Sequence, residues 1–303
     1  MDQTLDEKTM RYSQIDHLTT MMPGYQYVFQ PAHYFTHAAA SLQRDEEGVG
    51  VFSKYPIVDT EYLLLSQNLS DLEDEHRRVV LHVVISIPAE SYQFRGACTT
   101  GHVYNSSHCA KLLDVYTAHF PLSKAARQRH SKEVLTYIKQ SRKGDIQIFG
   151  GDLNAEPSED EIEVLLHKEV EHEYPNNIML DTWLCHHPEP ATGDSASDDE
   201  RENALTFASD NATKRIDYVF VSAASSLPME DICPNYPFPV KLPSGSPNSM
   251  KLKHVHPMFL IGQHHLPGTG DPENSDGMID KNSPLYASDH RGLVVDLTME
   301  THS

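Results

Sequence analysis

The chain has 303 residues, of which 39% are hydrophobic, and it carries a net charge of −20 from 24 basic and 44 acidic residues. This length and hydrophobic content predict a globular chain and exclude a disordered one. Non-specific binding to nucleic acid depends on Lys and Arg, so the acidic balance disfavours it. A nuclease with a locally basic or metal-filled cleft stays open.

The first half of the chain predicts two helices and several buried strands. Ile15, Leu18 and Met21 recur at helical spacing, which indicates a helix over residues 13–22. A second helix is expected over residues 124–139, with its apolar residues on one side. Apolar runs predict the strands, at residues 25–29, 48–52, 77–87 and 112–119.

The second half alternates in the same way but contains two long polar segments. Strands are predicted at residues 145–149, 218–221 and 292–297. Ser158 with Glu161 forms a capping-box pattern, which predicts a helix over residues 159–168. Residues 188–203 are small and acidic and predict a surface loop. Residues 234–284, rich in Pro, Gly and His, form a long insertion before the last strand.

Cysteine and histidine spacing gives no zinc motif. Cys98 and Cys109 flank a polar loop and could close a disulfide, whereas free thiols are the simpler interpretation of all four cysteines, which include Cys185 and Cys233. The histidines of the insertion lack accompanying ligands at fixed spacing, so we expect loop residues rather than a zinc site at His254, His256, His264 and His265.

Three polar motifs stand at the edges of predicted strands. They are Gly151-Asp152-Leu153-Asn154, Arg215-Ile216-Asp217-Tyr218 and Ser288-Asp289-His290. A carboxylate or amide at the end of a buried strand is held rigidly. If the three ends converge, their oxygens form a site for a hard divalent metal, with an imidazole beside it to serve a water nucleophile.

Together with three further motifs, this ordered series resembles the endonuclease/exonuclease/phosphatase superfamily, which includes deoxyribonucleases, abasic-site endonucleases, neutral sphingomyelinases, inositol-polyphosphate phosphatases and deadenylases. The further motifs are Glu47-Gly48-Val49-Gly50-Val51-Phe52-Ser53-Lys54, Tyr116-Thr117-Ala118-His119 and Thr206-Phe207. The resemblance implies a single α/β domain over residues 1–303, folded as a four-layer α/β sandwich with two packed mixed β-sheets and outer helices. Alternating strands and helices agree with this fold class.

The family pattern opens with a strand ending in Asn and a second ending in a metal-binding Glu, and residues 1–10 match neither. We therefore expect an N-terminally incomplete domain that is marginally stable, binds Mg²⁺ weakly and is nearly inactive unless an upstream segment is restored. A substitute ligand such as Glu7 or Glu46 is the alternative.

The resemblance also implies roles for individual residues. Asp152 and Asn154 would orient the water and the phosphate and help hold the metal, and Asp289 would complete the metal or water coordination. His290 would be the general base, with Asp217 as the carboxylate that orients it.

A second histidine is implied beside the phosphoryl group. His119 would donate hydrogen bonds to the phosphoryl oxygens and could protonate the leaving oxygen. Glu47 would be its carboxylate partner, although Glu46 is adjacent.

The sequence therefore predicts a Mg²⁺- or Mn²⁺-dependent phosphoester hydrolase. Its substrate would be a lipid headgroup, a small molecule or a nucleic acid, with nuclease activity as the substrate alternative. A catalytically inactive fragment or pseudoenzyme that binds phosphoesters or a partner is the other hypothesis. No apolar run approaches the about 20 residues that cross a bilayer. A cytoplasmic or extracellular location and the oligomeric state both stay open.

Overall fold

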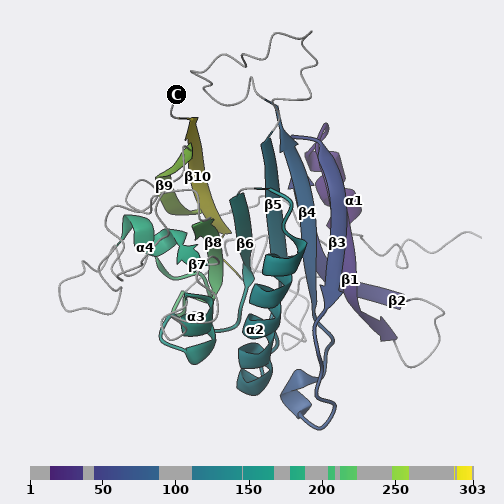
Figure 1. The fold of residues 1–303 in the computed structure, drawn as a ribbon. Coiled ribbons are helices and arrows are strands. Elements are labelled where there is room, and N and C mark those ends of the chain that lie inside the picture. The colour runs from purple at the N-terminus through teal and green to yellow at the C-terminus, as the bar shows by residue number, and fades with distance from the viewer. Residues whose placement is uncertain are drawn as a thin grey trace, which may run out of the picture.

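The centre of the fold is a six-stranded mixed sheet in the order β3-β4-β5-β6-β8-β7 (Figure 1). The computed structural model describes residues 14–36, 44–88, 111–144, 146–166, 178–187, 204–208, 212–223, 248–258, 290 and 292–301. Among the described strands of this sheet, only β5 and β6 pair in parallel. The strands are β3 (Ile57–Leu64), β4 (Val79–Ile87), β5 (Lys111–Ala118), β6 (Ile146–Asp152), β8 (Asp217–Ala223) and β7 (Ile178–Asp181).

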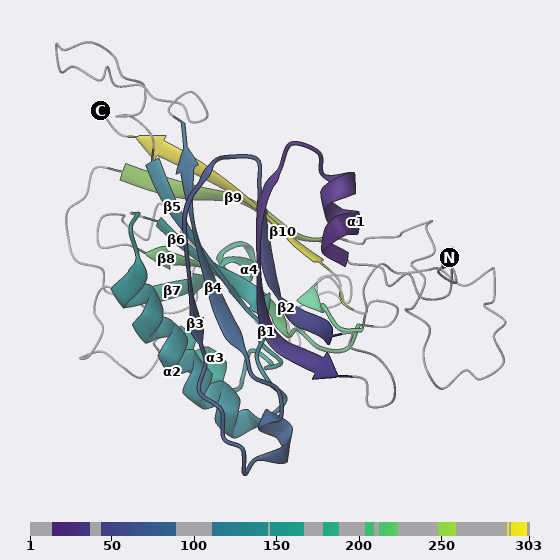
Figure 2. The same ribbon diagram turned by 90° about the vertical axis from the view of Figure 1, so that its right-hand side faces the viewer.

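Two helices cover one face of this sheet. These are α2 (Lys124–Ser141) and α3 (Asp160–Leu165), and α2 runs along the sheet in Figure 2. Ser123 begins α2, because its hydroxyl accepts a hydrogen bond from the Ala126 N–H. The helices bury an apolar cluster against the central strands, including Tyr116, Phe149 and Phe220.

Two antiparallel strand pairs stand apart from the six-stranded sheet. One consists of β1 (Gln26–Thr36) and β2 (Arg44–Ser53), and the other of β9 (Asn248–Met258) and β10 (Gly292–Thr301). The β1–β2 pair lies on the side of the sheet opposite α2, as Figure 2 shows, with α1 (Gln14–Met21) beyond it. Strand β2 packs over β4 and β5, whereas β10 packs over β8. The other helices within the described residues are η2 (Leu72–Asp74) and α4 (Thr182–His186).

The face of the sheet that points toward β1 and β2 is unevenly buried. Val83 on β4 is 0% exposed and belongs to an apolar cluster beneath the pair. Its ladder partner Val115 on β5, and Ile148 beside Val115 on β6, are only half-buried. Residues paired across a ladder share a face, so burial weakens from β4 toward β6.

The expected α/β sandwich is confirmed, and most predicted elements lie where the sequence placed them. Strands β3 and β7 and helix α4 were not predicted, and β9 occupies part of the expected insertion of residues 234–284. The acidic segment of residues 188–203 lies outside the described residues. His254 and His256 fall on β9, whereas His264 and His265 lie outside the described residues.

The predicted capping box was wrong. Glu159, not Ser158, is the N-cap of α3, and no side chain caps that helix. The reason is that the Glu161 carboxylate accepts a 2.5 Å hydrogen bond from Arg127 instead of folding back onto the cap. Glu161 is therefore a buried link between α2 and α3.

Free thiols were also the wrong interpretation at one position. Cys185 in α4 is disulfide-bonded, while Cys98, Cys109 and Cys233 lie outside the described residues. Among the described residues, no helix has the length and apolarity needed to cross a membrane.

Candidate active site

Four strand ends bring the candidate catalytic residues together. His119 directly follows β5, Asp152 is the last residue of β6, Asp217 is the first of β8, and His290 lies two residues before β10. Because β6 and β8 are antiparallel neighbours, the end of one strand meets the start of the other.

The shortest contact joins His290 to Asp217. Nδ1 of His290 lies 2.7 Å from Oδ2 of Asp217. A carboxylate only accepts hydrogen bonds, so Nδ1 carries the proton and Nε2 is left with its lone pair. That Nε2 atom lies 3.7 Å from Oδ2 of Asp152 and thus faces the other strand end.

A short segment of residues 204–208 supports this pair. Oγ1 of Thr206 accepts hydrogen bonds from the N–H groups of Ile216 and Asp217, at 3.1 and 3.2 Å. Phe207 forms a backbone bridge to His290, and the two rings lie 4.9 Å apart. Thr206 and Phe207 therefore hold the backbones of Asp217 and His290 in place.

Asp152 and Asp217 stand directly opposite each other on neighbouring strands. Like charges at such positions destabilise a sheet. Burial is the main cause that raises the pKa of Asp152, and the Asp217 carboxylate raises it further. One ligand atom from each of these residues and from His290 lies within 4.8 Å of the others. A cation at this point would relieve the repulsion, so the donor set fits a divalent metal.

His119 approaches the same Asp152 oxygen as His290 does. Its Nε2 atom lies 3.4 Å from Oδ2 of Asp152 and 3.2 Å from Nδ2 of Asn154. Asn154 has a φ of 48°, in the left-handed region that Asn tolerates, and its amide also donates to the carbonyl of Phe120 at 2.9 Å. The turn after β6 thus holds the Asn154 amide against the histidine.

Gly151 permits the close approach that this arrangement needs. Its φ is 148°, and a Cβ at this position would lie 1.9 Å from the carbonyl oxygen of Ala118. Only glycine therefore fits at this position, where the end of β6 lies against the end of β5. Gly151 directly precedes Asp152, and Ala118 directly precedes His119.

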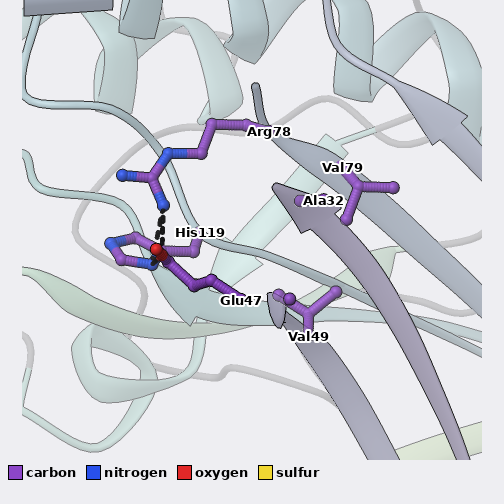
Figure 3. A pocket seen from close by; sticks show the side chains of 7 residues that line it. Ala32, Glu47, Val49, Arg78, Val79 and His119 are labelled. Atoms are coloured by element: carbon purple, nitrogen blue, oxygen red, sulfur yellow. Dashed lines mark hydrogen bonds and ion pairs between the residues drawn. The ribbon is translucent and has the colours of Figure 1, made fainter. Parts of the chain in front are cut away.

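Glu47 and Arg78 occupy the far side of His119. Nη1 of Arg78 lies 2.8 Å from Oε1 of Glu47 and 3.1 Å from Nδ1 of His119, and the same Glu47 oxygen is 3.5 Å from that ring nitrogen. Figure 3 shows the three side chains meeting beside a cavity of about 10 Å³ that they help to line. Hydrogen bonding to His119, and the nearby Arg78, lower the pKa of Glu47 to about 2.

The structure brings together six of the seven predicted site residues, namely Glu47, His119, Asp152, Asn154, Asp217 and His290. Asp289 lies outside the described residues. Glu47 rather than the exposed Glu46 faces His119. The sequence did not predict Arg78, because a basic residue before an apolar run is an ordinary solvated strand end. The signal that could have identified Arg78 is its position directly before β4, whose first residues pair with the end of β5.

The comparisons with known proteins agree with this fold. The chain matches the model of the Endonuclease/Exonuclease/phosphatase family over residues 5–290 and belongs to that family. No curated protein sequence matches it.

Two of the solved structures that are similar to it have TM-scores above 0.5. The human Nocturnin catalytic domain with bound sulfate has a TM-score of 0.53 and 13% identity, over 95% of this chain and 77% of that one. D. rerio TDP2 complexed with a single-strand DNA product has a TM-score of 0.52 and 14% identity, over 94% and 81% of the two chains. At these identities the likeness concerns the fold alone.

Proposed function

We propose that this protein hydrolyses a phosphoester with a water molecule activated by His290. The observation that supports this most is the His290–Asp217 pair, 2.7 Å apart, beside a carboxylate that stands opposite Asp217 on the next strand. The family comprises nucleases and phosphatases, whose common substrates are phosphoesters.

The pair has the geometry of a general base. Asp217 accepts a hydrogen bond from the Nδ1–H group, so the ring presents its basic Nε2 toward Asp152. When His290 takes a proton from water it becomes an imidazolium, and the Asp217 carboxylate stabilises that charge. Asp152, on the same side, would orient the water.

His119 and Asn154 would serve the phosphoryl group. Nδ2 of Asn154 and Nε2 of His119 lie 3.2 Å apart, and Nε2 of His119 lies 3.4 Å from Oδ2 of Asp152. Turned toward a bound phosphoryl group, their N–H groups would stabilise the negative charge that grows on its oxygens. Glu47 and Arg78 would hold the His119 ring in place from its Nδ1 side.

The residues that would hold a divalent cation are Asp152, Asp217 and Asn154, with Asp289 as the further expected ligand. Carboxylate and amide oxygens suit Mg²⁺ or Mn²⁺. When bound, such an ion would neutralise phosphoryl charge and lower the pKa of a coordinated water.

The test is a hydrolysis panel with Mg²⁺ or Mn²⁺ on bis-p-nitrophenyl phosphate, sphingomyelin, inositol phosphates and single-stranded nucleic acid. The panel is run on residues 1–303 and on a chain lengthened at its N-terminus. We expect the lengthened chain to turn over at least one phosphoester, with activity lost in EDTA and restored by Mg²⁺ but not by zinc alone. Lys124→Met, at an exposed surface ion pair on α2, serves as the active control. Full activity after exhaustive chelation would contradict the metal. Binding without turnover on every substrate would favour the pseudoenzyme.

A further inference from the structure

Tyr218 is the last residue of the Arg-Ile-Asp-Tyr motif. Its buried hydroxyl contacts the backbone of the two segments that carry Asp152–Asn154 and Asp217. Its side chain is 1% exposed and its ring stacks on Phe220. Its hydroxyl lies 2.8 Å from the carbonyl oxygen of Ala155 and 3.1 Å from that of Arg215. Ala155 directly follows Asn154, and Arg215 lies two residues before Asp217, so one hydroxyl touches both catalytic segments.

The backbone ladder between these segments ends just before this point. The ladder ends at the pair formed by Asp152, the final residue of β6, and Asp217, the first residue of β8. One more backbone hydrogen bond follows, from the Leu153 N–H to the carbonyl of Ile216 at 2.8 Å. Beyond it, the Tyr218 hydroxyl donates a hydrogen bond to the carbonyl oxygen of Ala155. A side chain, instead of the backbone, therefore links the two segments there.

Several neighbours fix the position of this hydroxyl. The Arg215 guanidinium lies 4.6 Å above the Tyr218 ring, and it also binds both carboxylate oxygens of buried Asp181, at 2.5 and 2.7 Å. Together with the stacked Phe220 ring, this guanidinium holds the Tyr218 side chain where its hydroxyl reaches the carbonyl of Ala155.

We propose that Tyr218 is a positioning residue, whose hydroxyl sets the spacing between the Asp152–Asn154 segment and the Asp217–His290 pair. This inference rests on the proposed function. The spacing matters because a water held by Asp152 must meet Nε2 of His290. A displacement of about 1 Å at a reacting centre can reduce turnover by about a hundred-fold.

Tyr218→Phe removes the hydroxyl and keeps the ring. Tyr116→Phe is the matched control, since Tyr116 is equally buried and its hydroxyl bonds Ser141 at 3.1 Å, away from the candidate site. We expect Tyr218→Phe to lower kcat by about ten- to a hundred-fold, with KM nearly unchanged. Tyr116→Phe should lower the Tm to a similar extent and leave kcat intact. Equal kcat losses in both variants, or none in Tyr218→Phe, would overturn the proposal.

A second measurement keeps the inference separate from the proposed function. Hydrogen–deuterium exchange should quicken in Tyr218→Phe at residues 153–157 and 212–217, and stay at the wild-type rate there in Tyr116→Phe. If the wild type turns over no phosphoester, the proposed function fails, and exchange alone decides on the bridge. Unchanged exchange in Tyr218→Phe would then reject it.

Discussion

Asp217 and His290 lie 73 residues apart in the sequence, yet their side chains form a 2.7 Å hydrogen bond. Each residue has a support of its own: the Thr206 hydroxyl accepts from the Asp217 N–H, and Phe207 pairs with His290. The two side chains therefore form one hydrogen-bonded unit, and the proposed chemistry requires both members.

This coupling predicts the behaviour of a double mutant. His290→Ala and Asp217→Asn should each lower kcat by about a thousand-fold or more, and the double variant should be little worse than either, because residues that act as a unit are non-additive. Steady-state kinetics on the most active substrate of the panel measures this. Losses that multiply in the double variant would separate the two residues.

Glu47 predicts a pH dependence of stability. Its pKa falls from 4.5 to about 2 through hydrogen bonding to His119 and the proximity of Arg78. A carboxylate with a lowered pKa contributes stability above its unfolded pKa and loses it as pH falls toward the folded value. The free-energy difference between wild type and Glu47→Gln should therefore be largest above pH about 4.5 and shrink toward pH about 2.

Urea unfolding at a series of pH values gives this difference directly. Glu46→Gln, at the adjacent exposed carboxylate, is the control. A constant difference between wild type and Glu47→Gln from pH about 5 to about 2.5 would contradict the lowered pKa.

The sequence predicted which candidate residues converge better than it predicted their contacts. Asp152, Asp217 and His290 stand in motifs at the ends of apolar runs, and their convergence was expected from these positions together with the family resemblance. Arg78 and Tyr218 carry no such signal. Their importance depends on which side chains meet across β4, β5, β6 and β8, and spacing along one strand does not contain that information.

At the scale of elements, α2 and α3 are joined by a buried ion pair. Arg127 lies 2.5 Å from the Glu161 carboxylate and 2.8 Å from that of Glu159, and Arg127 and Glu161 are both buried. Removing one partner of a buried pair leaves an uncompensated charge, which costs far more than the net value of the pair.

Arg127→Met should therefore lower the free energy of unfolding by about 3–5 kcal/mol. Lys124→Met, which removes an exposed 3.8 Å ion pair between the same helices, should change it by less than about 1 kcal/mol. The double variant Arg127→Met/Glu161→Met should recover part of the loss. Denaturant titrations compare all three, and equal effects of Arg127→Met and Lys124→Met would contradict the burial argument.

Elements with long apolar runs were predicted, and those without were missed. Strand β4 is buried at nearly every position, and its sequence is apolar except at His82 and Ser86. Strand β3 lies at the sheet edge with most of its residues exposed, and its sequence resembles a loop. The capping box failed for another reason: a distant arginine on α2 offered Glu161 a stronger partner than its own backbone.

At the scale of the whole molecule, the pairs β1–β2 and β9–β10 form no ladder with each other or with the main sheet in the part of the chain described. Val83 is fully buried under the first pair, whereas Ile148 on β6 is half-buried. Strand edges and apolar faces left open favour association with further polypeptide. We propose that an upstream segment of the chain, absent from residues 1–303, covers this face.

Ile148→Thr should therefore reduce concentration-dependent association of residues 1–303 and hardly change the Tm. Val83→Thr, on the same face beneath β1–β2, should lower the free energy of unfolding by about 1–3 kcal/mol. Light scattering and thermal unfolding measure the two effects. A chain lengthened at its N-terminus should lose the association and gain Mg²⁺ affinity. Monomeric behaviour at high concentration with full metal-dependent turnover would contradict this.

The opposed carboxylates of Asp152 and Asp217 also make the site a source of instability. Each must stay charged for the proposed chemistry, yet their repulsion acts against the folded state whenever no cation lies between them. Asp152→Asn should therefore raise the Tm in EDTA while abolishing turnover. Mg²⁺ should raise the Tm of the wild type and of His290→Ala, because a ligand that binds only the folded state stabilises it. In the absence of a cation, the inactive Asp152→Asn variant would then have a higher Tm than the wild type. The Tm of the wild type would report cation occupancy even where no substrate is known.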